Sequence, residues 1–144
     1  MKGWIAVDFD GTLAIYDKWV SAEHCGEPIA PMVERVKRWL AKGHEVRVFT
    51  ARCWPLVKPI TPDFDLSGLV AIARSNAPLS VAEEFARAAT AITSIRAWCK
   101  EHIGQELTVT CVKDYGMHEL WDDRAVAVEA NTGRALTPSR RGLD

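Results

Sequence analysis

Short hydrophobic runs alternate along the chain with longer stretches in which apolar residues recur every three or four positions. The short runs predict buried strands at 4–7, 46–49, 107–112, 119–121 and 125–128. The longer stretches predict helices at 29–42, at 66–74 and from Ser80 to about 102. Strands that alternate with helices in this order predict an α/β fold, in which helices cover a parallel sheet.

Residues at the element boundaries agree with this division. Pro31 suits the first turn of a helix, and Gly43 and Gly104 suit the positions just after two helix ends. The spacing of Ser80 and Glu83 predicts a capping box at the start of the long helix. Alternating threonines in the third strand predict an edge strand with one wetter face.

Length and composition indicate one globular domain over residues 1–144. Hydrophobic residues make up 48% of the chain, charged residues 26%, and the net charge is −1. This balance disfavours disorder, and it disfavours strong attraction to nucleic acid or to an anionic membrane. The N-terminus lacks the pattern of a signal peptide, and no apolar run approaches about 18 residues. We therefore expect a soluble, cytoplasmic protein with a polar, flexible tail at 137–144.

The four cysteines give no indication of a metal site or a disulfide framework. None of them is paired as Cys-x-x-Cys, which disfavours zinc. Cys99 and Cys111 fall within apolar patterns and are expected to be buried thiols. Cys53 lies near the predicted site, but no neighbouring base is evident that would activate its thiol.

Polar side chains follow four of the predicted strands directly. In a parallel sheet the carboxyl ends of the strands meet at one edge, where ligands bind. We therefore expect these residues to gather there: Asp8, Asp10, Thr50, Arg52, Lys113, Asp122 and Asp123.

The chemistry of this set favours phosphoryl transfer. Crowded carboxylates need a compensating cation, and oxygen ligands without histidine or cysteine favour Mg²⁺. Thr50 and Lys113 can donate to phosphate oxygens, whereas Arg52 suits either a substrate contact or a structural salt bridge. An ionised Asp8 needs no base to act as a nucleophile, and a partly protonated Asp10 could act as acid and then base.

The turn after the first strand supplies further donors. Gly11 allows the chain to turn sharply, and the main-chain amides there are expected to meet phosphate oxygens. The full set of expected phosphate-binding residues is Gly11, Thr12, Thr50, Ala51, Arg52 and Lys113.

Four sequence motifs in this order resemble the haloacid dehalogenase superfamily. Residues 8–12, DFDGT, resemble its DxDGT motif, and Thr50 in FTAR resembles its second motif. Lys113 stands where the third motif has its lysine, and residues 121–124, WDDR, resemble the acidic fourth motif. The likeness runs from about residue 5 to residue 133. It looks closest to small bacterial and phage members.

The resemblance implies a Rossmann-like, three-layer sandwich with strand order 5-4-1-2-3 and helices on both faces. It implies that Asp8 is the nucleophile and Asp10 the acid and base. The metal ligands would be Asp8, the main-chain carbonyl of Asp10, and Asp122 or Asp123. Members with a second aspartate at the Asp10 position are typically phosphatases and phosphotransferases.

No insertion in the chain is long enough to form a cap domain. Residues 14–28 can form a short flap, and residues 53–78 form a modest loop insertion. The site is therefore expected to be open to large substrates, or to be closed by a second subunit of a homodimer. Tyr16, Trp19 and Trp54 lie in these loops, where they could pack or stack on a base.

These observations favour a Mg²⁺-dependent phosphomonoester hydrolase with an aspartyl-phosphate intermediate. Its substrate would be phosphorylated, with a nucleotide or a nucleic-acid 3′-phosphate as one candidate and no membrane partner. Two alternatives stay open: a non-enzymatic module that binds phosphate or nucleotides, and a phosphotransferase.

Overall fold

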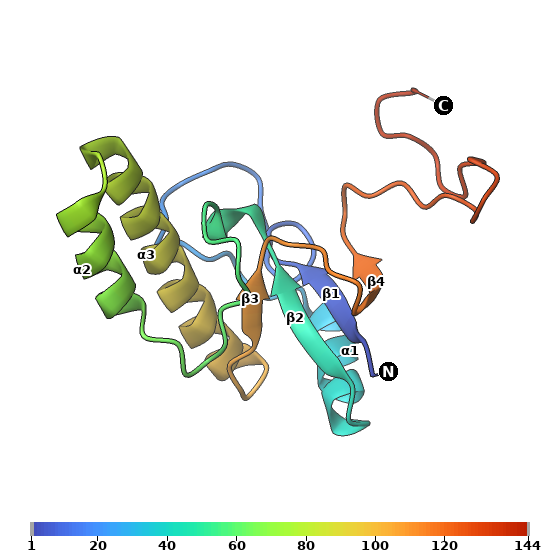
Figure 1. Ribbon diagram of the computed structural model, residues 1–144. Coiled ribbons are helices and arrows are strands. Elements are labelled where there is room, and N and C mark those ends of the chain that lie inside the picture. Colours follow the sequence, from blue (N-terminus) through green and yellow to red (C-terminus); the bar gives the residue numbers. More distant parts are fainter. Residues whose placement is uncertain (1, 144) are drawn as a thin grey trace.

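The computed structural model describes residues 2–143 and confirms the α/β class. Four parallel strands form one sheet in the order β3-β2-β1-β4 (Figure 1). The strands are β1 (Trp4–Asp8), β2 (Glu45–Phe49), β3 (Thr108–Thr110) and β4 (Met117–Trp121). The helices are α1 (Ala30–Ala41), α2 (Leu66–Asn76) and α3 (Leu79–His102), with a short 3₁₀ turn, η1 (Ala51–Cys53), after β2.

The hydrophobic core lies between one face of the sheet and the helices α1 and α3. Val7, Val48 and Val109 pair across the strands and share that face, because side chains alternate along a strand. They belong to one buried cluster with residues of α1 and α3, and the Phe9 ring meets the Trp98 ring edge-on at 5.0 Å. The connection from β1 through α1 to β2 and the connection from β2 through α3 to β3 cross the sheet in the same direction. Such connections are right-handed, so α1 and α3 lie on the same face of the sheet. The third helix, α2, packs against α3.

The expected helices on both faces of the sheet are not found. Within residues 2–143, the connection from β3 to β4 is only residues 111–116, which is too short for a helix. It runs over the other face of the sheet instead (Figure 1). Asp114 anchors it there by accepting a hydrogen bond of 2.8 Å from the Trp4 indole. The order of four strands agrees with the expected order, but the three-layer sandwich does not form.

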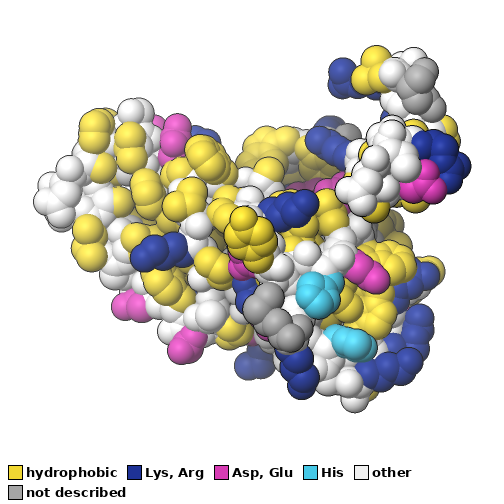
Figure 2. Space-filling view, turned by 45° about the vertical axis from the view of Figure 1, so that its right-hand side comes forward, with side chains coloured by type: hydrophobic (Ala, Val, Ile, Leu, Met, Phe, Trp, Pro, Cys, Tyr) yellow, Lys and Arg dark blue, Asp and Glu magenta, His cyan; other side chains and the backbone are white. Residues whose placement is uncertain are grey.

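The fifth strand, expected at 125–128, is absent from the sheet. Val128 forms an isolated antiparallel bridge with Ala135, and the Glu129 amide donates to the Arg134 carbonyl at 2.8 Å. The chain after β4 thus folds onto itself and extends away from the sheet (Figures 1 and 2). Because no helix follows β4 to return the chain, a parallel neighbour for β4 cannot form. The expected tail, 137–144, includes Asp144, which lies outside the described residues.

Two further expectations about the elements are corrected. Strand β3 does lie at the edge of the sheet, as expected. The expected wetter face is not found at Thr110, which is buried. Ile60 covers the outer side of the strand by exchanging two main-chain hydrogen bonds with Val109, of 2.8 and 3.0 Å. No side chain caps α3, because it begins directly after Pro78 and Ser80 lies inside its first turn. The expected helix-ending glycines are confirmed: Gly43 and Gly104 have φ of +84° and +100°.

None of the helices within residues 2–143 is both long enough and apolar enough to cross a bilayer.

Candidate active site

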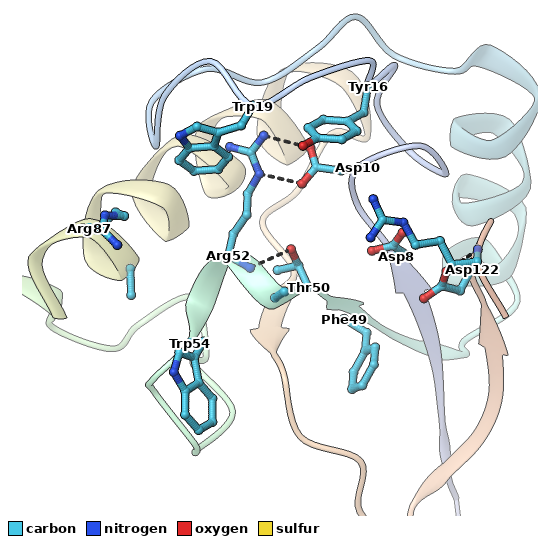
Figure 3. Close-up of a pocket in the computed structure, with 13 residues that line it drawn as sticks. Asp8, Asp10, Tyr16, Trp19, Phe49, Thr50, Arg52, Trp54, Arg87 and Asp122 are labelled. Carbon is cyan, nitrogen blue, oxygen red and sulfur yellow. Dashed lines mark hydrogen bonds and ion pairs between the residues drawn. The ribbon is translucent and has the colours of Figure 1, made fainter. Parts of the chain in front are cut away.

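A pocket of about 530 Å³ opens at the carboxyl ends of the strands, where the sequence places the polar residues. Its walls come from β1, β2, η1, α3, the segment after β4 and the flap. Figure 3 shows the pocket with Asp8 and Asp122 on one side and the Asp10–Arg52 pair beside them. The lining residues are Asp8, Asp10, Tyr16, Trp19, Phe49, Thr50, Ala51, Arg52, Trp54, Arg87, Ala88, Asp122 and Arg124.

Three carboxylates converge at one end of this pocket. Asp8 ends β1, and Asp122 and Asp123 follow the neighbouring strand β4. Each residue has one carboxylate oxygen within 4.8 Å of the others. This confirms that the first and fourth strand ends bring their acidic residues together, and both Asp122 and Asp123 take part.

The turn after β1 fixes the position of Asp123. The Thr12 hydroxyl donates to Asp123 Oδ1 at 3.2 Å, and the Asp123 amide donates back to the Thr12 hydroxyl at 3.1 Å. Gly11 has φ of +86°, and a Cβ there would lie 2.7 Å from Asp123 Oδ2. The amides of Gly11 and Thr12, expected to meet phosphate, donate to the carbonyls of Ala14 and Phe9 within the turn.

The electrostatics of the acidic end call for positive charge. The pKa of Asp8 is raised from 3.8 to about 8, chiefly by burial, then by a hydrogen bond with Asp123 and the charges of Asp122 and Asp123. Three ionised groups this close repel one another unless a proton or a cation compensates them. The set is all oxygen, and such a donor set fits a hard divalent cation.

Asp10 does not join the acidic cluster through its side chain. Arg52 donates to both of its carboxylate oxygens, at 2.6 and 2.8 Å. The same guanidinium donates to the His24 carbonyl at 2.8 Å and lies 5.1 Å from the centre of the Trp19 ring. Of the two roles open for Arg52, the structure shows the salt bridge, and the hydrogen bond from the same guanidinium to His24 ties the flap to the end of β2.

Thr50 and Lys113 differ in how they relate to the pocket. Thr50 is buried at the end of β2, and its hydroxyl accepts the Arg52 amide at 3.2 Å; within residues 2–143 the hydroxyl donates to no other group. Lys113 is exposed and lies outside the pocket lining. Cys53 is buried, and burial raises the pKa of its thiol, so a reactive thiolate is disfavoured, as expected.

Two basic residues of the pocket were not expected from the sequence as site residues. Arg124 was interpreted as structural, and Arg87 of α3 was not considered. One signal could have identified Arg87. The helix that connects two parallel strands starts near the carboxyl end of the first strand, so the N-terminal half of α3, which includes Arg87, lies close to the site. Arg87 also adjoins Ala88, which belongs to the apolar stripe of α3 and is buried.

The fold and the site together define a parallel α/β protein with an acidic cluster at its strand ends. Comparison with known proteins adds nothing to this description, because no family model, no curated protein and no solved structure matches the chain.

Proposed function

We propose that the protein is a Mg²⁺-dependent phosphomonoester hydrolase in which Asp8 is the nucleophile. The observation that carries the proposal is the convergence of Asp8, Asp122 and Asp123 within 4.8 Å at the end of an open pocket. A carboxylate beside a bound cation can attack phosphorus without a base to activate it. The proposal agrees with the haloacid dehalogenase-like motif order of the sequence.

The residues at the acidic end supply the reaction steps. Asp8, Asp122 and Asp123 would hold Mg²⁺, which neutralises charge on the phosphate oxygens when bound. An Asp8 oxygen bonds to phosphorus while the bond to the leaving oxygen breaks, and Asp10 gives its proton to that oxygen. Water then attacks the phosphorus of the aspartyl phosphate and passes a proton to Asp10. Inorganic phosphate leaves, and Asp8 is restored.

We assign the positioning of the phosphate to Thr50 and Arg124. The Thr50 hydroxyl has a proton to donate to a phosphate oxygen, and Arg124 lines the same end of the pocket as Asp122. Lys113 stays a prediction for this role, because its side chain lies outside the pocket lining.

Asp10 must change partners during the cycle. Both of its oxygens accept hydrogen bonds from Arg52, so one oxygen has to leave the guanidinium before it can protonate a leaving group. Arg52 also holds the flap through the His24 carbonyl. Substrate that binds against Arg52 would let one Asp10 oxygen leave the guanidinium and take up a proton from solvent, while the other oxygen stays oriented by Arg52.

The substrate class that we favour is a nucleotide or a nucleic-acid 3′-phosphate. Tyr16, Trp19 and Trp54 line the pocket, and the last two are 51% and 64% exposed. Exposed rings beside a phosphate site can stack on a base.

Phosphate release from an aryl phosphate with Mg²⁺ tests the proposal. Asp8→Asn is expected to reduce turnover to background while the chain stays folded, because the amide is a poor nucleophile and a weak cation ligand. Asp17→Asn is the matched control, because Asp17 is an exposed carboxylate outside the pocket lining. Full turnover in Asp8→Asn would exclude Asp8 as the nucleophile.

A wild-type protein that binds nucleotides with no turnover would indicate the non-enzymatic binding module instead. Phosphate transfer to an added alcohol in competition with water would indicate a phosphotransferase.

A further inference from the structure

The pocket has a second end whose chemistry is opposite to that of the acidic cluster. Arg87 and Trp54 lie there, on the far side of the Asp10–Arg52 pair from Asp8 and Asp122 (Figure 3). Arg87 comes from α3 and Trp54 directly follows η1. The phosphorylated group and the rest of a substrate would thus meet different surroundings.

Arg87 is an exposed cation that pairs with no carboxylate at salt-bridge distance within the described structure. It makes no hydrogen bond and no ion pair with any of residues 2–143, although Glu83 and Glu84 lie one turn away on the same helix. Arg52, by contrast, is fully engaged with Asp10 and the flap. Arg87 is therefore the cation at this end that is free to bind an anion.

The Trp54 ring is also available to a ligand. Its side chain is 64% exposed at the pocket wall, whereas the Trp19 ring already lies 5.1 Å from the Arg52 guanidinium. Trp54 and Arg87 line the same pocket, so the pocket offers both an exposed ring on which a base can stack and a cation that can bind an anion.

We propose that Arg87 and Trp54 bind the leaving group of the substrate, and that this group is a nucleoside carrying a second phosphate. The inference rests on the proposed function, which assigns the phosphate to be cleaved to Asp8. A nucleoside monophosphate has no other anion for Arg87. A second phosphate supplies it, either as a free monoester or as the phosphodiester of a nucleic-acid end, and the base supplies the ring for Trp54.

Selectivity for the second phosphate is the quantity to measure. The substrates are adenosine 3′-monophosphate, adenosine 3′,5′-bisphosphate, a dinucleotide with a terminal 3′-phosphate, and a sugar bisphosphate that lacks a base. In the wild-type protein kcat/KM is expected to be about tenfold or more higher for a compound with both a base and a second phosphate. The bisphosphate and the dinucleotide together show whether a free phosphate or a phosphodiester is preferred.

Matched variants assign that selectivity to the two residues. Arg87→Gln should bring the ratio of bisphosphate to monophosphate kcat/KM close to one, and Arg87→Lys should restore part of it. Arg74→Gln removes the same charge from an exposed arginine of α2 and should leave the ratio unchanged. Trp54→Ala should remove the advantage of a base and Trp54→Phe should keep much of it, whereas Tyr115→Ala, at a fully exposed ring elsewhere, should not alter it.

Binding measurements separate failure of this inference from failure of the proposed function. Calorimetry on the Asp8→Asn protein should show tighter binding of the bisphosphate than of the monophosphate, and Arg87→Gln in that background should remove the difference. Asp8-dependent hydrolysis with no preference for a second phosphate, in rate or in binding, overturns the inference alone. Absence of hydrolysis with an Arg87-dependent binding preference overturns the hydrolase proposal and leaves the anion site. A sugar bisphosphate that performs as well as the nucleoside bisphosphate overturns the assignment of Trp54.

Discussion

Gly11 shows how one residue can serve both the backbone turn and the acidic cluster. Its φ of +86° lies where residues with a Cβ are strained, and Asp123 occupies the space that a Cβ would need. Asp123 is one of the three carboxylates of the acidic cluster. A methyl group at this position would therefore strain the turn and also displace Asp123, which we propose as a Mg²⁺ ligand.

We predict that Gly11→Ala lowers the free energy of unfolding by about 1–2 kcal/mol and weakens Mg²⁺ binding as well. Gly43→Ala is the matched control, because Gly43 has φ of +84° but nothing within 4 Å of the position of a Cβ. Denaturant unfolding should show a loss in both variants, and only Gly11→Ala should lower the affinity for Mg²⁺ in calorimetry. Equal Mg²⁺ affinity in the two variants would contradict the role given to this contact.

Among the elements, the flap depends most on a single side chain. Arg52 joins the flap to the strand end through the His24 carbonyl, Asp10 and the Trp19 ring. The base of the flap is held separately: the Ile15 amide donates to the Glu27 carbonyl at 2.8 Å, and the Trp98 indole donates to the Gly26 carbonyl at 2.9 Å. Loss of the guanidinium should therefore loosen the tip while the base stays in place.

We predict that Arg52→Ala speeds amide hydrogen exchange in residues 16–26 and leaves α1 unaffected. Turnover should fall about tenfold to a hundredfold, because Asp10 loses the contact that orients it. Arg74→Ala serves as the control for the loss of an arginine outside the site. If peptides from the flap exchange at the same rate in Arg52→Ala as in the wild type, Arg52 does not hold the flap.

The sequence predicts those features of the fold that depend on local pattern. Strand ends and helix ends follow from hydrophobic period and from residues such as Gly43, and parallel order then brings Asp8 next to Asp122 and Asp123. The fifth strand is different, because a run of alanine and valine has strand character whether or not a sheet edge is within reach. Pattern alone cannot show that residues 125–128 lack the returning helix that would place them beside β4.

The parts of the site that sequence could not predict depend on tertiary contacts. The pairing of Arg52 with Asp10 requires the flap to fold over both residues, which no local signal encodes. Arg87 lines the pocket because the packing of α3 fixes how the helix is rotated about its axis and where it lies along the sheet. The ends of β1, β2 and β4 were therefore predictable as a group, whereas Lys113 after β3 lies outside the pocket lining and the charges that complete the pocket were not predicted.

At the scale of the whole molecule, the acidic cluster links stability to pH and to the Mg²⁺ binding that we propose for it. The pKa of Asp8 is raised from 3.8 to about 8, so the folded chain holds a proton between about pH 4 and pH 8 that the unfolded chain releases. The contribution of Asp8 to stability is fully present below pH 4 and is lost as the pH rises through 8. Asp65 and Asp114 have lowered pKa values, because their ionised forms accept side-chain hydrogen bonds. Their contribution to stability has the opposite pH dependence: it is present above about pH 4 and is lost as the pH falls further.

We therefore predict that, without divalent cations, the part of the unfolding free energy that depends on Asp8 falls as the pH rises from 5 to 8. Mg²⁺ should reverse this trend, because it competes with the proton for the same carboxylates and binds the folded state more tightly as the proton leaves. Thermal unfolding from pH 5 to pH 9, with Mg²⁺ and with a chelator, gives both curves.

The gap between them should widen with pH in the wild-type protein and stay narrow in Asp8→Asn, which keeps the shape of the side chain but does not titrate. The gap should be unaffected in Asp17→Asn, because that carboxylate is not part of the cluster. If the gap in the wild type does not depend on pH, or if it persists unchanged in Asp8→Asn, the cation binds elsewhere and the acidic cluster is not its site.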